Sequence, residues 1–461
     1  MQPFEKIKKY RDTVCEQIRW KKAKPMIATE IENHLCDQRD AYITDGDNEK
    51  IATDKAILQM GDAVSIGLEL DKTHKPKPQW TMITLTGILM SIGILVNYII
   101  DTSEYSLNTF SILPFLLAFG LFILCYYLDF TILGKYAMAI YFATLGFSSM
   151  GILLGTGING SFIWILGHFS VSLSYLALTF PLVFALFVYK QRKKGYHGIL
   201  LSGIGFLPLA ALLVIIPTTT GLILYTLSAL TILCFAIWKG WFGVNRKQGL
   251  LLVLIPTLVI FVLVVVFITQ KASDRLSTFL NPYEDRLGAG YLLSLIRDFL
   301  SESVFIGKGG IPHNVTGIVS LPNISTDYSL VYLIHQYGFV VLFAVTAFII
   351  SFAIIAIYKA MKQKSALGSI IALSIVLTFI LQSILYIVDN LGYGLVSSLS
   401  LPFISYGNSA LFINAALIGF MLSVFRTGDI CNDNIASSKN NNPVFSYKDG
   451  KLTVDFKGGK I

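Results

Sequence analysis

An acidic residue, Asp327, stands directly before an apolar run in the sequence LPNISTDYSLVYLIHQYGF, residues 321–339. A carboxylate at such a boundary can take a proton from a hydroxyl group if partial exclusion of water raises its pKa above the ordinary value of about 3.9. By position alone, the commoner role would be that of a helix N-cap. Either role requires a helix that begins close behind Asp327.

The other residue types that often carry chemistry are scattered. His313 and His335 are isolated, and no cysteine accompanies either of them, so we expect no zinc site. The five cysteines lie at positions 15, 36, 125, 234 and 431 and have the pattern of ordinary free thiols. The residues alone therefore leave both roles of Asp327 open.

The composition of the chain excludes an ordinary soluble enzyme. Of its 461 residues, 54% are hydrophobic and only 14% are charged, whereas a soluble domain has about 25% charged residues. The net charge of +8 does not indicate a nucleic-acid partner, because residues 1–79 carry equal numbers of basic and acidic side chains and the excess lies in loops and the tail. The sequence predicts an integral membrane protein.

Apolar stretches of about 20 residues recur along the chain, which is the length that crosses a bilayer as a helix. We therefore predict an all-α polytopic membrane protein with about ten transmembrane helices. The expected spans are 81–100, 109–129, 136–154, 169–189, 198–216, 219–238, 249–269, 329–358, 368–388 and 408–425.

The loops between these spans alternate in charge. Lys and Arg occur at 135, 190–194, 239–247 and 359–364, whereas the loops 101–108, 155–168, 217–218 and 389–407 contain none. Because short cytoplasmic loops are enriched in Lys and Arg, this pattern predicts a multi-pass protein with both termini in the cytoplasm.

We expect four regions along the chain. Residues 1–75 form a cytoplasmic helical module, with Ile27, Ile31 and Leu35 on one helix face and a further helix over 51–60. Residues 76–80 form a linker, 81–426 form the membrane domain, and 427–461 form a cytoplasmic flexible tail with one hairpin. The large outer loop 270–328 contains an amphipathic helix near 290–305, which we expect to lie on the membrane surface.

Two segments resemble the FtsW, RodA and SpoVE family, the shape, elongation, division and sporulation group. The first contains RLSTFLNPYEDRLGAGY, IGKGG and LPNISTDY, and the second is SLPFISYGNSALFINAALIGFMLSVFR, residues 400–426. These motifs occur in the order and at the topological places typical of the family. The resemblance covers residues 81–426 and implies ten transmembrane helices with a large outside loop after the seventh.

Members of this family polymerise lipid II into glycan strands, usually with a class B penicillin-binding protein that crosslinks the product. The resemblance implies that Asp327 is the catalytic residue. The departing diphosphate would need a cation, either a divalent ion such as Mg or Mn or a loop side chain among Arg275, Arg286, Arg297 and Lys308. The glycines at 288, 290, 307, 309 and 310 would let backbone N–H groups approach phosphate.

The resemblance also implies a set of substrate contacts. They are Arg275, Asn281, Asp285, Gly288, Gly290, Tyr291, Lys308, Thr326, Trp164, Ser405, Tyr406 and Asn408. The segment 401–408 can equally be only a helix-breaking corner, and Arg297 can extend to lipid headgroups. These alternatives stay open at the level of the sequence.

The chain departs from the family pattern in the predicted cavity walls. Its NGSFIWI, residues 159–165, lacks the arginines of the family's NGARRWI, and its IPTTTG, residues 216–221, lacks the aspartate of QPDLGT. Two other functions therefore stand beside that of a polymerase. One is a non-catalytic scaffold or regulator of cell-wall synthesis. The other is a flippase for the lipid-linked precursor, although transport calls for ionisable groups within the spans, which are almost absent here.

Overall fold

The computed structural model describes residues 3–21, 23–101, 111–158, 161–166, 169–271, 273–310, 321–394, 399–428, 445–448 and 451–454. The chain divides into two compact units. The first comprises Met1–Pro78 with Arg426–Asn432, and the second comprises Gln79–Phe425 with Asp433–Ile461. The division between Pro78 and Gln79 lies within the segment expected to be a linker.

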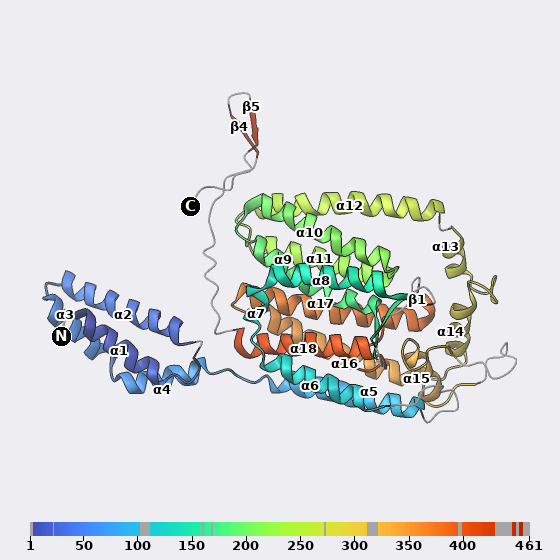
Figure 1. Ribbon diagram of the computed structural model, residues 1–461, viewed down its shortest axis with the longest axis horizontal. Coiled ribbons are helices and arrows are strands. Elements are labelled where there is room, and N and C mark those ends of the chain that lie inside the picture. Colours follow the sequence, from blue (N-terminus) through green and yellow to red (C-terminus); the bar gives the residue numbers. More distant parts are fainter. Residues whose placement is uncertain are drawn as a thin grey trace. The chain divides into compact units, whose positions relative to one another are not determined.

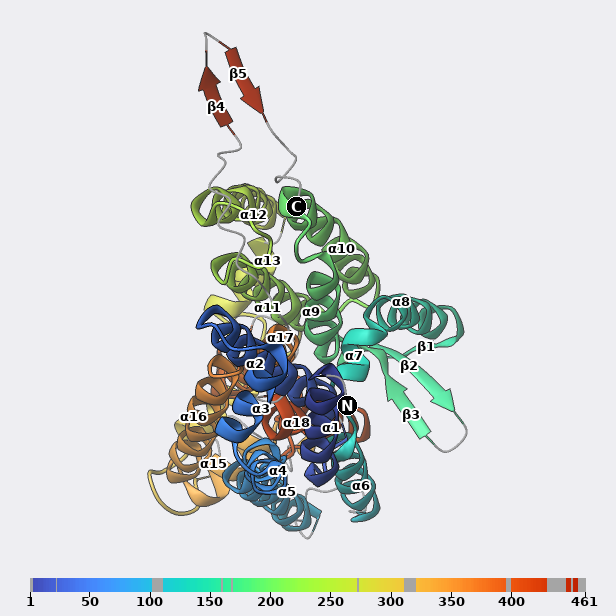
Figure 2. The ribbon, with the colours of Figure 1, turned by 90° about the vertical axis from the view of Figure 1, so that its left-hand side faces the viewer.

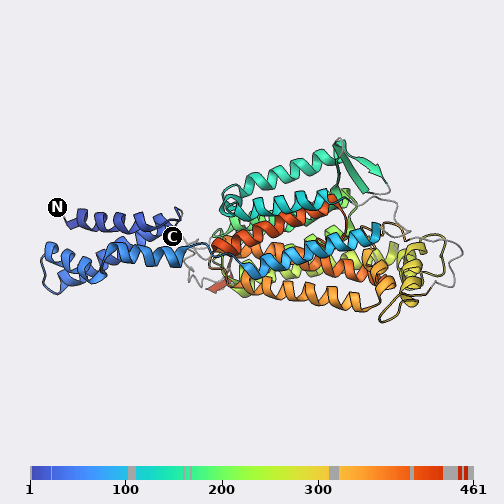
Figure 3. The same cartoon turned by 90° about the horizontal axis from the view of Figure 1, so that it is seen from below.

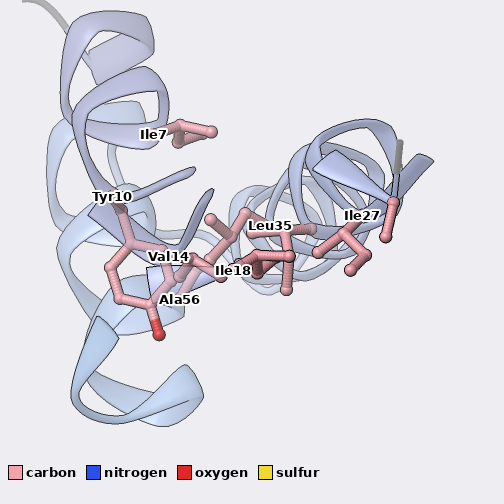
Figure 4. Close-up of a cluster of buried hydrophobic side chains, with 9 residues drawn as sticks. Ile7, Tyr10, Val14, Ile18, Ile27, Leu35 and Ala56 are labelled. Carbon is pink, nitrogen blue, oxygen red and sulfur yellow. The ribbon is translucent and has the colours of Figure 1, made fainter. Parts of the chain in front are cut away.

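The first unit contains four helices, α1 (Pro3–Gln17), α2 (Lys24–Thr44), α3 (Glu49–Met60) and α4 (Ala63–His74). The predicted apolar face of α2 is buried, with Ile27, Ile31 and Leu35 no more than 5% exposed. Figure 4 shows the side chains of Ile27 and Leu35 with those of Val14 and Ile18 in the core of this unit. The apolar spacing of the sequence therefore predicted the main buried face correctly.

Helices dominate the second unit, and each of the ten predicted spans contains at least one of them. Their bounds are α5 (Trp80–Asp101), α6 (Leu113–Tyr127), α7 (Thr131–Lys135), α8 (Ala137–Leu154), α9 (Phe180–Gln191), α10 (Gly195–Ile215), α11 (Thr219–Trp238), α12 (Arg246–Lys271), α16 (Val340–Met361), α17 (Ala366–Val388) and α18 (Asn408–Thr427). Among the described residues, eight helices are long and apolar enough to cross a membrane, and α6 is a shorter apolar helix. The prediction of a polytopic all-α membrane protein is confirmed.

The predicted span 329–358 is wrong in one respect, because the chain forms two helices there. Helix α15 (Ser329–Tyr337) ends at Gly338, and α16 begins at Val340. The φ angle of Gly338 is +93°, and a Cβ atom at this position would lie 2.5 Å from the Phe305 carbonyl oxygen. Glycine permits both the positive φ and the close approach of a second backbone, so the helix is interrupted at this residue.

A small sheet was not predicted by the sequence pattern. Strands β1 (Thr156–Ile158), β2 (Ser161–Leu166) and β3 (Phe169–Ser172) pair antiparallel in that order, with Trp164 opposite Val171. Figure 2 shows the three strands side by side next to α8. Strand β3 occupies the start of the predicted span 169–189, which then continues as the short helix η1 (Leu173–Leu178) and α9.

The segments between α12 and α16 gather at one end of the helical bundle. They include α13 (Ser273–Leu280), α14 (Tyr291–Ser301) and α15. Figures 1 and 3 show these segments together at the end of the bundle that also carries the strands β1–β3. We call this the loop end of the bundle. In the tail, β4 (Phe445–Lys448) and β5 (Lys451–Val454) form the expected hairpin.

Candidate functional site

Asp327 lies in a tight backbone turn at the loop end. The carbonyl oxygen of Asn323 accepts hydrogen bonds from the N–H groups of Thr326, at 3.0 Å, and Asp327, at 2.9 Å. Asn323 has a φ angle of +51°, in the left-handed region that asparagine tolerates better than most residues. Its amide Nδ2 donates to Asp327 Oδ2 at 3.2 Å. Asn323 therefore positions both the backbone and the carboxylate of Asp327.

The Asp327 carboxylate is half-buried, and this burial raises its pKa to about 6. The side chains of Asn323 and Thr326 partly offset the effect, because they favour the charged form. A carboxylate with such a pKa is mostly ionised at neutral pH and yet accepts a proton more readily than an ordinary aspartate. Asp327 is not the N-cap of α15, because Tyr328 occupies that position and makes no side-chain cap hydrogen bond.

The last turn of α17 and the residues directly after it hold the Asp327 turn from a second side. Asn390 Nδ2 donates to the Asp327 carbonyl oxygen at 2.9 Å, and Asn390 Oδ1 accepts from the Val331 N–H at 3.3 Å. One turn earlier, the Tyr386 hydroxyl lies 2.7 Å from Ser329 Oγ and accepts from the Leu330 N–H at 3.3 Å. Both Asn390 and Tyr386 are fully buried.

Sequence reasoning missed this pair of residues. A signal was present, because Gln382, Tyr386 and Asn390 occur four residues apart in an apolar run and therefore share one helix face. A polar stripe on a membrane helix usually faces the protein interior. The sequence alone does not say which segment the stripe contacts.

Asn390 lies in a π-helical turn, η2 (Asp389–Tyr393), that follows α17. Such turns displace the following backbone and occur often at functional sites. Gly392, in this turn, has a φ angle of +76°, and its carbonyl oxygen accepts from Arg297 Nε at 3.0 Å. Arg297 Nη2 also donates to the Phe279 carbonyl oxygen at 3.1 Å. Arg297 therefore links α14 to the turn that holds Asp327, rather than extending only to lipid headgroups.

The segment 399–407 brings two further predicted residues to the Asp327 turn. The Tyr406 N–H donates to the Ser325 carbonyl oxygen at 2.9 Å. Ser405 is buried, and its hydroxyl lies 3.2 Å from Ser329 Oγ and accepts from the Leu401 N–H at 3.0 Å. Asn408 begins α18, and its Oδ1 is buried without a hydrogen-bond partner among the described residues. Trp164 is in β2, where its ring lies 5.4 Å from that of Phe147.

The predicted contacts between 281 and 291 form a second turn. Asn281 Nδ2 donates to Glu284 Oε1 at 3.1 Å, and Asp285 Oδ2 accepts from the Ala289 N–H at 2.8 Å. A Cβ atom at Gly290 would lie 2.1 Å from the Pro282 carbonyl oxygen, so glycine is required by close backbone packing. Tyr291 is exposed at the start of α14. These contacts give most of the motif a role in shaping the loop.

The five glycines expected to let backbone N–H groups approach phosphate donate those groups to carbonyl oxygens of the protein. The N–H groups of Gly288 and Gly290 donate to the Asp285 carbonyl oxygen, at 3.2 and 3.1 Å. Those of Gly307, Gly309 and Gly310 donate to carbonyl oxygens of Tyr337, His335 and Glu302. All five donors are satisfied within the protein, so side chains are better candidates for contact with an anion.

The predicted cations differ in availability. Arg286 is ion-paired with the buried Asp298, which also accepts a hydrogen bond from the Tyr283 hydroxyl at 3.2 Å. Lys308 is exposed and makes no hydrogen bond or ion pair with the described residues. The side chain of Arg275 lies outside the described residues. Lys308 and Asp327 lie near opposite ends of α15, which is nine residues or about 13 Å long.

The amphipathic helix predicted near 290–305 is α14, but its apolar face does not lie against the membrane. Leu295 and Ile296 are at most 3% exposed and pack against Leu321, Tyr328 and Val331. The helix therefore covers the Asp327 segment. The amphipathic spacing of this helix was predicted correctly. The prediction that its apolar face lies on the membrane was wrong.

The described residues do not form a dedicated metal cage. No three His, Cys, Asp or Glu side chains among them lie close enough to bind one ion. His335 Nε2 hydrogen-bonds to the Gly310 carbonyl oxygen at 2.8 Å, and His313 lies outside the described residues. Mg²⁺ is commonly held by one or two carboxylates together with phosphate oxygens of a ligand, so Asp327 would fit such an ion only together with a phosphate-bearing ligand.

Comparisons with known proteins give relatives of the membrane domain. A protein from Acinetobacter baylyi named "Probable peptidoglycan glycosyltransferase FtsW" is 26% identical over 279 residues, which cover 59% of this chain and 68% of that protein. One of the same name from Coxiella burnetii is 28% identical over 290 residues, 59% of this chain and 73% of that protein.

Solved structures share the fold. A chain in the structure described as "Structural coordination of polymerization and crosslinking by a peptidoglycan synthase complex" matches with a TM-score of 0.60 and 19% identity, over 76% of this chain and 98% of that chain. The rod shape determining protein RodA of Thermus thermophilus matches with a TM-score of 0.50 and 17% identity, over 76% and 97%.

The family match covers the membrane domain and both motif segments. Residues 75–429 match the FtsW/RodA/SpoVE family, which carries the description "Cell cycle protein". This range includes α5 to α18 and every predicted site residue. The chain therefore belongs to the FtsW/RodA/SpoVE family of multi-pass membrane proteins.

Proposed function

We propose that this protein is a peptidoglycan glycosyltransferase that polymerises lipid II at the outer face of the bacterial plasma membrane. The observation that carries the proposal is the half-buried carboxylate of Asp327, whose pKa is raised to about 6 at the position of the family's catalytic aspartate. The names of the relatives from Acinetobacter baylyi and Coxiella burnetii support the same activity.

In the proposed reaction, a sugar hydroxyl of one lipid-linked chain attacks the anomeric carbon of another. A new glycosidic C–O bond forms, the bond to the lipid diphosphate breaks, and Asp327 takes the hydroxyl proton. The diphosphate leaves with the electron pair of the broken bond. Arg275 is the loop cation proposed to stabilise its charge, because Lys308 lies near the opposite end of α15 from Asp327.

The site residues divide into two groups under this proposal. Thr326, Asn323 and the turn at 323–328 set the basicity of Asp327, while Tyr406 and Ser405 hold that turn in place. Trp164, Asn408 and Tyr291 are proposed to contact the substrate, as are Asn281 and Asp285 of the neighbouring turn, which Gly288 and Gly290 shape. The buried, unpartnered Oδ1 of Asn408 supports a ligand contact at that residue.

We also propose the orientation and partners of the protein. The Lys and Arg distribution supports cytoplasmic N- and C-termini, which would put the loop end of the bundle outside. A class B penicillin-binding protein is the proposed crosslinking partner, and the fold shared with a chain of the peptidoglycan synthase complex supports this proposal. The four-helix unit at the N-terminus is proposed to dock a cytoplasmic partner or signal.

The polymerase proposal is tested by reconstituting the purified protein with lipid II, with and without a cognate penicillin-binding protein and a divalent cation. We expect glycan polymer from the wild type and at least a hundredfold less from Asp327→Asn. The matched control is Glu302→Gln, which neutralises a carboxylate at the end of α14 in the same loop and should leave the rate unchanged.

Other outcomes separate the two alternatives. A wild-type protein that forms no polymer alone but stimulates a partner, equally well with Asp327→Asn, would identify a scaffold. Translocation of labelled lipid II across vesicles without polymerisation would identify a flippase. The absence of charged side chains from most of the spans favours the scaffold over the flippase.

A further inference from the structure

Three large apolar residues follow one another in the loop after α14. Val304, Phe305 and Ile306 are 42%, 64% and 71% exposed. Consecutive exposed residues of this kind are unusual at a water-facing loop and normally mark a contact surface. We call residues 304–306 the apolar tip. The apolar face of α14 is already covered by protein, so the tip is the part of this segment that is available to the surroundings.

Backbone hydrogen bonds fix the apolar tip to the break between α15 and α16. The Phe339 N–H donates to the Val304 carbonyl oxygen and the Val340 N–H to that of Phe305, each at 3.1 Å. On the other side of the tip, the Gly307 N–H donates to the Tyr337 carbonyl oxygen at 3.1 Å. The tip therefore lies at the level of the first turn of α16 along the helix axis.

The surroundings of that turn are indicated by α16 itself. It has 22 residues, or a length of about 33 Å, which matches a hydrocarbon core of about 30 Å. Among the eight candidate spans it is the most apolar, and only 17% of its most apolar 18-residue stretch is buried in the protein. The ring of Phe305 lies 6.2 Å from that of Phe343, which is 59% exposed on the first turn. The tip thus continues the lipid-facing surface of α16 at its end.

A cation stands next to the apolar tip. Lys308 is exposed, and it follows Ile306 by two residues. A lysine stem can lie along apolar surface while its ammonium reaches the level of the lipid phosphates. Apolar side chains in the hydrocarbon with a cation at the headgroup are the usual features of an interfacial anchor.

We propose that residues 304–308 are a membrane anchor, in which the apolar tip inserts into the lipid leaflet at the loop end and Lys308 binds a phospholipid phosphate. The occupant is lipid because the tip is continuous with the lipid-facing side of α16. The anchor holds the C-terminal end of α15 at the bilayer surface, which fixes the height of the Asp327 turn at the other end. This inference does not require that the protein is a polymerase.

The test uses the photo-crosslinking amino acid p-benzoylphenylalanine in the full-length protein. It is placed at Ile306, at Leu287 and at Ile354, and each variant is irradiated in nanodiscs of phosphatidylglycerol and phosphatidylethanolamine. Leu287 is 95% exposed in the same loop, and Ile354 is 61% exposed in the middle of α16. We expect phospholipid adducts at 306 and 354, at least fivefold more abundant than at 287.

The outcomes decide between lipid and other occupants. Adducts at 354 with no excess at 306 over 287 would overturn the anchor. A cross-link from 306 to a protein in native membranes, in place of lipid, would also overturn it and would indicate a partner surface. In the protein labelled at Ile306, Lys308→Gln should lower the ratio of phosphatidylglycerol adducts to phosphatidylethanolamine adducts at least twofold. An unchanged ratio would show that Lys308 is not part of the anchor.

Discussion

Two carboxylates of the loop end are withdrawn from water, and their partners differ. Asp298 is ion-paired with Arg286, whereas Asp327 contacts only neutral hydrogen-bond donors among the described residues. Burial without a neighbouring cation raises the pKa of Asp327. Asp327 can therefore serve as a base near neutral pH.

The raised pKa predicts the pH dependence of polymerisation. Because the base acts in its ionised form, the rate should fall as the pH drops through about 6, by about tenfold for each further pH unit. The measurement is kcat/KM for lipid II between pH 4.5 and 8. An acid limb centred near pH 4 would contradict the desolvated environment of Asp327.

The same burial predicts a gain in stability when the charge is removed. The folded state binds the Asp327 proton more tightly than the unfolded chain does, so the free energy of unfolding decreases as the pH rises from about 4 to 6 and stays lower above it. Asp327→Asn should therefore be more stable than the wild type at pH 7.5, by about 1–2 kcal/mol after allowance for partial exposure. Thermal unfolding in detergent at pH 7.5 and pH 4 tests this, and the difference should vanish at pH 4.

At the scale of elements, the π-helical turn after α17 is the support of the candidate site. Asn390 should act as a positioning residue, because its amide bonds to the Asp327 carbonyl oxygen and to the start of α15. Asn390→Ala should lower kcat by about tenfold to a hundredfold with little change in KM, since misplacement of a base affects the transition state most.

A charged variant distinguishes positioning from simple loss of packing. Asn390→Asp keeps the acceptor for the Val331 N–H but adds a negative charge beside the Asp327 turn, so the acid limb should move to higher pH. The matched control is Asn245→Ala, which removes an acceptor for the Lys247 N–H in another loop. Equal losses in all three variants, with no pH shift, would rule out a positioning role.

The break between α15 and α16 should also be sensitive to a single methyl group. Gly338→Ala places a Cβ atom 2.5 Å from the Phe305 carbonyl oxygen at a φ angle of +93°, so we expect a loss of about 2–3 kcal/mol. Gly146→Ala is the control, because Gly146 lies in α8 with no atom within 4 Å of the added methyl group. Unfolding midpoints in detergent should fall for the first variant and stay equal or rise for the second.

At the scale of the whole molecule, the first unit has a hydrophobic core of its own. Residues 1–78 should therefore fold without the membrane domain and give a helical far-UV circular dichroism spectrum with a cooperative melt. Val14→Asp, at a fully buried position, should abolish this transition. Leu58→Asp, at a position that is 83% exposed, should leave it intact. A non-cooperative melt of the parent fragment would show that the unit depends on the rest of the chain.

The sequence by itself determined the multi-pass membrane character and much of the helical content. The length of an apolar stretch indicates whether it can cross a bilayer as a helix. All ten expected spans contain a helix. The spacing of Ile27, Ile31 and Leu35 likewise identified a buried face, because helical periodicity is a local property. The motif resemblance selected Asp327, whose catalytic role stays a prediction.

Only the tertiary structure decided what each face covers and what each polar group binds. Asn390 is 63 residues from Asp327 in the sequence, and α14 packs on the Asp327 segment instead of on lipid. The glycine N–H groups of the loop donate to carbonyl oxygens within the protein. Helix α15 ends at Gly338, where the backbone of Phe305 passes close by. Local patterns show that a face is apolar or that a group is polar, but the partner is chosen by long-range packing.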